Sequence, residues 1–149
     1  MSELSRVVAH YLDGRLVKGT TEDFEPTQPT FTLHPGGSGV PMKVECRKLK
    51  ALFFVRNLAG DPGRDDAYGF GRVASESEKG KKIAIQFKDG EVLFGYTLAY
   101  TNEHDGFYVA PADPNSNNIR IYVNRNAAHK ILVGARAEAL ANQSGRKAA

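Results

Sequence analysis

Basic side chains and tyrosines are the residues of this chain whose types and spacing indicate chemistry. Lysines and arginines gather at residues 43–56 and again at residues 120–125. Cationic side chains bind phosphate oxygens, and exposed tyrosine rings are platforms on which nucleic-acid bases stack. The candidate binding surface consists of Lys43, Arg47, Lys48, Lys50, Arg56, Tyr108, Arg120, Tyr122 and Arg125. The competing interpretation is that alternating strands simply expose these polar side chains to water.

No group of residues in the sequence indicates a catalytic or a metal site. The 4 histidines lack the spacing of metal ligands, and zinc needs three or four converging ligands. Asp13 and Asp89 each precede a glycine, and turn formation explains both. Cys46 lies in an alternating apolar run, which predicts a buried and unreactive thiol. We therefore expect no enzyme activity, no catalytic residues, no cofactor and no metal.

Two loops are weaker candidates for ligand contact. The segment HPGGSG at residues 34–39 lacks the Lys-Ser/Thr pair of phosphate-binding loops, so a flexible connection is favoured. The segment PADPNSNN at residues 111–118 is rich in Asn and Asp. Such side chains bond to their own backbone in tight turns, but they can also face a ligand. Turn formation is favoured for this loop, and ligand contact stays open as the alternative.

The elements that would position these residues occur twice in the sequence. The pattern of residues 7–35 returns in residues 83–111 at an offset of 76. Each copy has an alternating run that reaches Asp-Gly, which is typical of a two-residue hairpin loop. The next strand of each copy has a glycine in its middle, Gly19 or Gly95, which indicates a bend or a close backbone approach. Later strands match at offsets of 77 and then 78.

Five short strands in each copy, with no convincing helix between them, predict an all-β fold. We expect two tandem five-stranded small barrels related by internal duplication. Residues 1–58 would form the first barrel and residues 83–134 the second. Residues 59–82 are rich in Gly, Asp and Ser and would form a linker. Residues 135–149 would form a tail with modest helix propensity as far as residue 141.

The composition is that of a soluble globular protein, with 41% hydrophobic and 25% charged residues. A formal net charge of +3 permits nucleic-acid binding without arguing for it. The chain begins without the apolar core of a signal peptide, and no apolar run is long enough to cross a bilayer. We therefore expect a cytoplasmic protein that does not bind membranes.

The hairpin pattern, in which alternating apolar residues lead to Asp-Gly and a glycine-bearing strand, resembles the opening of Sm-like and SH3-like small barrels. The segments LKALFFVR at residues 49–56, FKDGEVLFGYT at 87–97 and FYVAPADPNSNNIRIYV at 107–123 are also similar to an uncharacterised bacterial domain family. Members of that family often stand beside PilZ and response-regulator signalling modules. The resemblance implies SH3-like or Sm-like barrels and a signalling context. Arg120 and Arg125 do not have the spacing of the cyclic di-GMP motif of PilZ domains.

The function expected from the sequence is that of a non-enzymatic binding or adaptor module in bacterial signalling or regulation. Its expected partner is another protein. The alternative is a nucleic-acid or anionic-nucleotide binder that uses the basic strands. The sequence leaves homo-oligomer formation open.

Overall fold

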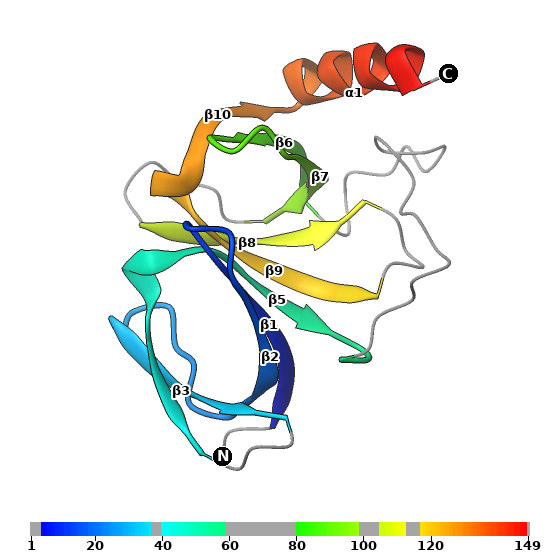
Figure 1. Ribbon diagram of the computed structural model, residues 1–149. Helices are drawn as coiled ribbons and strands as arrows, with labels where there is room; N and C mark the ends of the chain where they lie inside the picture. The colour runs from blue at the N-terminus through cyan, green and yellow to red at the C-terminus, as the bar shows by residue number, and fades with distance from the viewer. Residues whose placement is uncertain (1–3, 37–39, 59–79, 99–104, 113–116, 149) are drawn as a thin grey trace.

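Ten strands form one sheet in the computed structural model (Figure 1), which describes residues 4–36, 40–58, 80–98, 105–112 and 117–148. The first half contains β1 (Ser5–Tyr11), β2 (Leu16–Thr21), β3 (Thr30–Pro35), β4 (Met42–Glu45) and β5 (Leu49–Val55). The second half contains β6 (Lys81–Phe87), β7 (Val92–Thr97), β8 (Gly106–Pro111), β9 (Asn118–Asn124) and β10 (Ala128–Val133). Short 3₁₀ turns, η1 (Cys46–Lys48) and η2 (Arg125–Ala127), precede β5 and β10, and the helix α1 (Ala135–Ala148) follows β10.

The sheet is antiparallel throughout and runs in the order β10-β6-β7-β8-β9-β5-β1-β2-β3-β4. The predicted all-β class is confirmed, but two separate closed barrels are not. A strand has only two edges, and those of β5 are taken by β1 and by β9 of the other half. Because β5 has no edge left for β4, the first half curls without closing, and the two halves become one sheet.

The ladders correct the sequence alignment of the later strands. Phe31 on β3 pairs with Val44, whereas Phe107, which lies 76 residues later, pairs with Val123, which lies 79 residues after Val44. The offset of 77 expected for these strands was therefore wrong by two residues. The difference lies in the strands, because β9 has 7 residues and β4 has 4. At the start of β9, Asn118 and Arg120 pair with β5 and not with β8.

The Asp-Gly hairpins also differ from the two-residue loops that we expected. The amide of Tyr11 donates to Arg15 at 2.9 Å and the amide of Gly14 donates to Tyr11 at 3.0 Å. The loop therefore has three residues, and only the glycine has positive φ, at 94°. This is a three-residue loop with a glycine bulge. The Asp13 carboxylate accepts the Arg15 amide at 3.0 Å, which explains the aspartate.

Two cores lie on opposite faces of the sheet, and β5 contributes to both. Phe54 packs in the core of the first half, whereas Phe53 packs in the core of the second half beside Ile83 and Ile121. All residues of β5 are buried. This arrangement follows from the alternation of side chains along a strand whose two faces are both covered.

The C-terminal helix extends further than the expected end at residue 141, because α1 reaches Ala148. Ala137 and Ala141 pack against Ala84, Phe94 and Tyr96 on the outer face of the second half. Burial of this face stabilises a helix of modest intrinsic propensity. Among the described residues, no helix has the length and apolar character needed to span a bilayer.

Some predicted features fall outside the described residues. Most of the expected linker, at residues 59–79, and the middle parts of the two candidate loops, at residues 37–39 and 113–116, are not described. The end of the expected linker is described, and Lys81 and Lys82 belong to β6.

Candidate binding site between the two halves

A cavity of about 340 Å³ lies where the β2–β3 connection meets the ends of β5 and β9. Phe24 and the segment 26–30 form one side, and η1 contributes Cys46 and Arg47. The second half contributes Asp105, Tyr122, Asn124 and Asn126. A volume of this size is within the range of small-molecule and side-chain pockets, which combine apolar walls with a few polar groups.

Aromatic rings form the apolar wall of this cavity. Phe24 meets Tyr122 edge-on with ring centroids 5.3 Å apart, and it meets Phe31 in the same way at 5.2 Å. Tyr122 in turn packs on Tyr108 at 5.0 Å. Burial raises the pKa of both tyrosine hydroxyls. These edge-to-face contacts favour one arrangement of the rings, so the wall is preorganised.

Two features of the structure hold Tyr122 and Asn124 in place. A Cβ on Gly106 would lie 2.6 Å from the Tyr122 ring, so glycine leaves the space that the ring occupies. The side chain of Asn124 donates to the carbonyl of Leu49 at 2.8 Å. It also accepts the amide of Asn126 at 3.0 Å. The buried Asn124 thereby fixes η2 against β5 of the first half.

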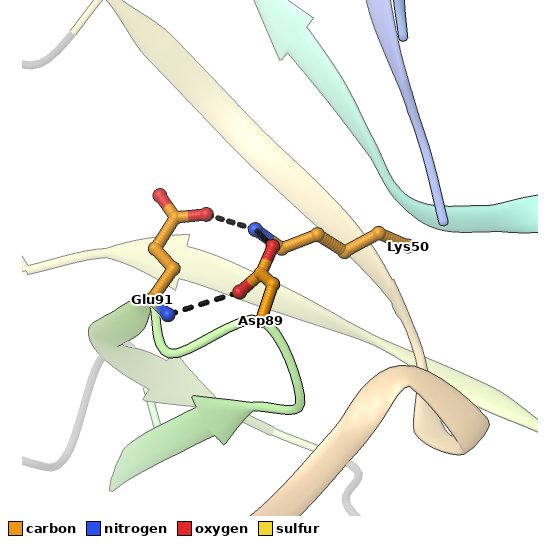
Figure 2. A network of polar contacts seen from close by, with 3 residues as sticks. All are labelled: Lys50, Asp89 and Glu91. Atoms are coloured by element: carbon orange, nitrogen blue, oxygen red, sulfur yellow. Dashed lines mark hydrogen bonds and ion pairs between the residues drawn. The ribbon is translucent and has the colours of Figure 1, made fainter. Parts of the chain in front are cut away.

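An ion-pair network joins the halves close to this junction. The ammonium of Lys50 on β5 donates to Asp89 at 2.7 Å and also to Glu91, both from the β6–β7 turn (Figure 2). Burial acts to lower the pKa of Lys50, but the two hydrogen bonds outweigh it and the pKa lies above its ordinary value. The same Lys50 bond lowers the pKa of Asp89. Because Lys50 is only 7% exposed, the carboxylates of Asp89 and Glu91, and not solvent, balance its charge.

Comparison with known families adds one finding. Residues 3–134 match a family of unknown function, DUF6982. The chain belongs to this family. The match spans every strand of both halves and ends just before α1. The expectation of an uncharacterised family is confirmed to this extent. No curated protein and no solved structure matches the chain.

In the DUF6982 fold, the basic residues predicted on the first half differ in exposure and in their ion pairs. Arg47 and Lys48 on η1 are exposed, and both approach Glu45, at 3.7 and 2.8 Å. Lys43 is exposed on β4, and Arg56 follows the end of β5. Lys50 is withdrawn into the inter-half network. Lys50 is therefore withdrawn from the predicted surface, whereas the other four basic residues of the first half stay exposed.

Three residues of the candidate binding surface lie in contact on the second half: Arg120 stacks on Tyr108, and Tyr108 packs on Tyr122. The guanidinium of Arg120 lies over the rings of Phe54 and Tyr108, with its central carbon 4.5 and 5.2 Å from their centroids. Tyr108 is 37% exposed. Arg125 on η2 donates its backbone amide to Asp105 at 2.9 Å. The outer end of the aromatic wall therefore carries an exposed, stacked cation.

Sequence reasoning missed the first-half side of the cavity. Phe24 lies in the repeated segment at residues 7–35, but no sequence pattern marks Phe24, Gln28 or Pro29 as a binding residue. Cys46 is half-buried and lines the cavity, in contrast to the fully buried position that we expected. The strand explains this error, because β4 ends at Glu45 and the alternation does not continue to Cys46, which lies in η1. No cluster of metal-ligating side chains occurs among the residues that the structure describes.

Proposed function

We propose that this protein is a non-enzymatic binding module that captures a protein partner in the cavity between its two halves. The observation that carries the proposal is the preorganised aromatic wall of Phe24 and Tyr122 beside the polar rim of Gln28, Arg47 and Asn126. An apolar side chain of the partner would occupy the cavity, and its backbone would bond to the rim. The setting in bacterial signalling rests on the family resemblance.

The chemistry of the lining supports binding rather than catalysis. Burial raises the pKa of the Cys46 thiol, which lowers its thiolate fraction and its nucleophilicity. The described lining includes no histidine that could act as its base. The backbone carbonyl of Gln28 accepts the thiol at 3.7 Å. This contact leaves the thiol as a packing group of the wall.

A blocking substitution tests the proposal. Peptides selected from a display library for binding to the wild-type protein are titrated calorimetrically against two variants. Thr27→Trp places an indole at the exposed rim of the cavity, whereas Glu22→Trp places the same group at an exposed site outside the lining. We expect Thr27→Trp to weaken binding about tenfold or more, and Glu22→Trp to leave it unchanged. Equal affinity for both variants would contradict the proposal.

The second candidate function is binding of a nucleic acid or an anionic nucleotide. The exposed Arg120, stacked on Tyr108, favours it, because a stacked guanidinium combines charge with a planar surface. If this function holds, affinity for a single-stranded oligonucleotide falls steeply with salt. Arg120→Ala would then weaken binding more than Arg15→Ala, since Arg15 is exposed on the distant β1–β2 turn and paired with Asp13 at 2.8 Å.

A further inference from the structure

One strand at the end of the sheet, β4, has an edge that pairs with no other described strand. Among the described strands, β4 pairs with β3 alone and is the last in the sheet order. Its residues Met42 to Glu45 alternate between the core side, which holds Val44 at 1% exposure, and the outer face. Exposed edges template the addition of another strand unless the sequence opposes it.

The hydrogen-bond pattern shows which backbone groups face outward. The amide of Cys46 donates to the carbonyl of Pro29 at 2.9 Å. Hydrogen-bonded and non-hydrogen-bonded pairs alternate along an antiparallel ladder, so Val44 bonds to Phe31, and Lys43 and Glu45 point away from β3. The contacts of Thr32 support this assignment. Thr32 lies opposite Lys43, but its amide points away from β4 and donates to the Asp23 carboxylate at 2.9 Å.

We propose that β4 pairs antiparallel with β4 of a second copy, about a twofold axis that passes beside Val44. In this register the residue opposite each Lys43 is Glu45 of the other copy. Both residues have outward backbone groups, so the two strands exchange four amide-to-carbonyl bonds. Pro41 occupies the next outward position and has no amide proton, which limits the ladder to this length. The result is a continuous sheet through both copies.

The side chains match the same register. Lys43 and Glu45 lie on one face of β4, two residues apart, so twofold pairing sets opposite charges against each other twice. Opposite charges directly across an antiparallel ladder are favourable, and like charges are unfavourable. Glu45 also contacts Lys48 at 2.8 Å through Oε2, whereas its Oε1 lies 3.7 Å from Arg47, beyond hydrogen-bond distance, and can accept the incoming ammonium. The sequence Met-Lys-Val-Glu is therefore complementary to itself.

The opposite end of the sheet argues against a head-to-tail arrangement. Within the chain, β9 pairs with the edge of β5. At this junction the side chains of Val8 on β1 and Phe53 on β5 pack in the core of the second half. The corresponding pair in the second half is Ala84 and Leu132. That pair is covered by α1. α1 therefore occupies the face of β10 that corresponds to the face of β5 used within the chain, which disfavours pairing of β4 with β10 of a neighbouring copy and favours pairing of β4 with β4.

Sedimentation equilibrium of the full chain, up to about 1 mM because a short ladder makes a weak interface, tests the proposal. We expect a monomer–dimer equilibrium. Lys43→Glu should raise the dissociation constant about tenfold, because both cross-strand pairs become repulsive. Lys43→Glu with Glu45→Lys should restore much of the affinity. Lys18→Glu, at an exposed position of β2, makes the same charge change and should leave dimerisation intact.

A second measurement separates loss of pairing from loss of folding. Lys43→Pro removes only an outward amide, so the monomer should keep its dispersed amide spectrum but no longer dimerise. A wild-type protein that stays monomeric throughout would overturn the proposal, as would assemblies larger than a dimer. A Lys43→Pro or Lys43→Glu variant that dimerises like the wild type would also overturn it.

Discussion

At the scale of single residues, the surroundings of His10 keep its imidazole neutral. Its ring packs on Phe53 with centroids 4.0 Å apart. Burial lowers its pKa from 6.5 to about 4, although Glu91 and Asp89 act in the opposite direction. Lys50, which those two carboxylates hold close by, adds to the lowering. The inter-half network therefore places a positive charge near a histidine that lies in an apolar setting.

This histidine predicts a specific dependence of stability on pH. Because the folded pKa lies below the unfolded one, the unfolded chain binds the proton more readily between pH 6.5 and about 4. Stability from this group is present above pH 6.5 and falls as the pH is lowered through that window. Urea unfolding at pH 7 and pH 5 should show a loss of about 1–2 kcal/mol that His10→Gln removes. The exposed His129, changed to Gln, should leave the loss intact, and an unchanged loss in His10→Gln would contradict the assignment.

At the scale of elements, glycines set how closely neighbouring strands approach. β2 pairs with β1 over its whole length but with β3 only at Gly19 and Thr20. A Cβ on Gly19 would collide with the carbonyl of His34, and one on Gly95 would collide with the carbonyl of Ala110. Of the two alternatives expected from the sequence, a bend or a close backbone approach, the structure shows the close approach at both glycines. This approach lets each half curl around its own core.

Alanine substitutions test this role of the glycines. Gly19→Ala and Gly95→Ala should each lower the free energy of unfolding by about 1–3 kcal/mol, because the added methyl group meets backbone that cannot easily move. Gly36→Ala is the matched control, since no heavy atom lies within 4 Å of the added Cβ. Chemical denaturation of the three variants gives the comparison. A loss at Gly36 as large as at Gly19 would contradict the contact explanation, because the lower entropy of the unfolded chain should by itself make Gly36→Ala slightly stabilising.

At the scale of the whole molecule, the shared strand β5 should make the two halves unfold together. The core of the second half contains Val8, Phe53 and Val55 from the first half. Loss of the first half would therefore expose the second core. The Lys50 network and the Asn124 bond to Leu49 cross the same boundary. The first-half core is built from its own residues, with Tyr122 of the second half packed against it, so the dependence runs mainly from the second half to the first.

Core substitutions on either side of β5 test this cooperativity. Leu33 and Ile85 are both 0% exposed, the first in the core of the first half and the second in the other core. Changing either to Ala should cost about 2–5 kcal/mol. Each variant should still unfold in one calorimetric transition, with equal calorimetric and van't Hoff enthalpies. Two transitions, of which only one shifts, would show that the halves are independent.

The sequence by itself determined the local structure of this protein. Alternation predicted the strands, Asp-Gly marked the hairpins, and the repeated glycines marked the bends or close approaches, because each depends on residues close together in the chain. The basic residues could be counted but not grouped, since Lys50 and Arg56 lie near each other in sequence and in different environments in space.

Only the tertiary structure decided how the halves combine. Whether β5 closes its own barrel or pairs with β9 depends on competition between two edges, and both edges offer the same backbone groups. That choice brings Tyr122 and Asn124 to the β2–β3 connection and creates the cavity. It also withdraws Lys50 from the surface and leaves β4 at the end of the sheet. The candidate site is thus a product of long-range pairing, which no local pattern records.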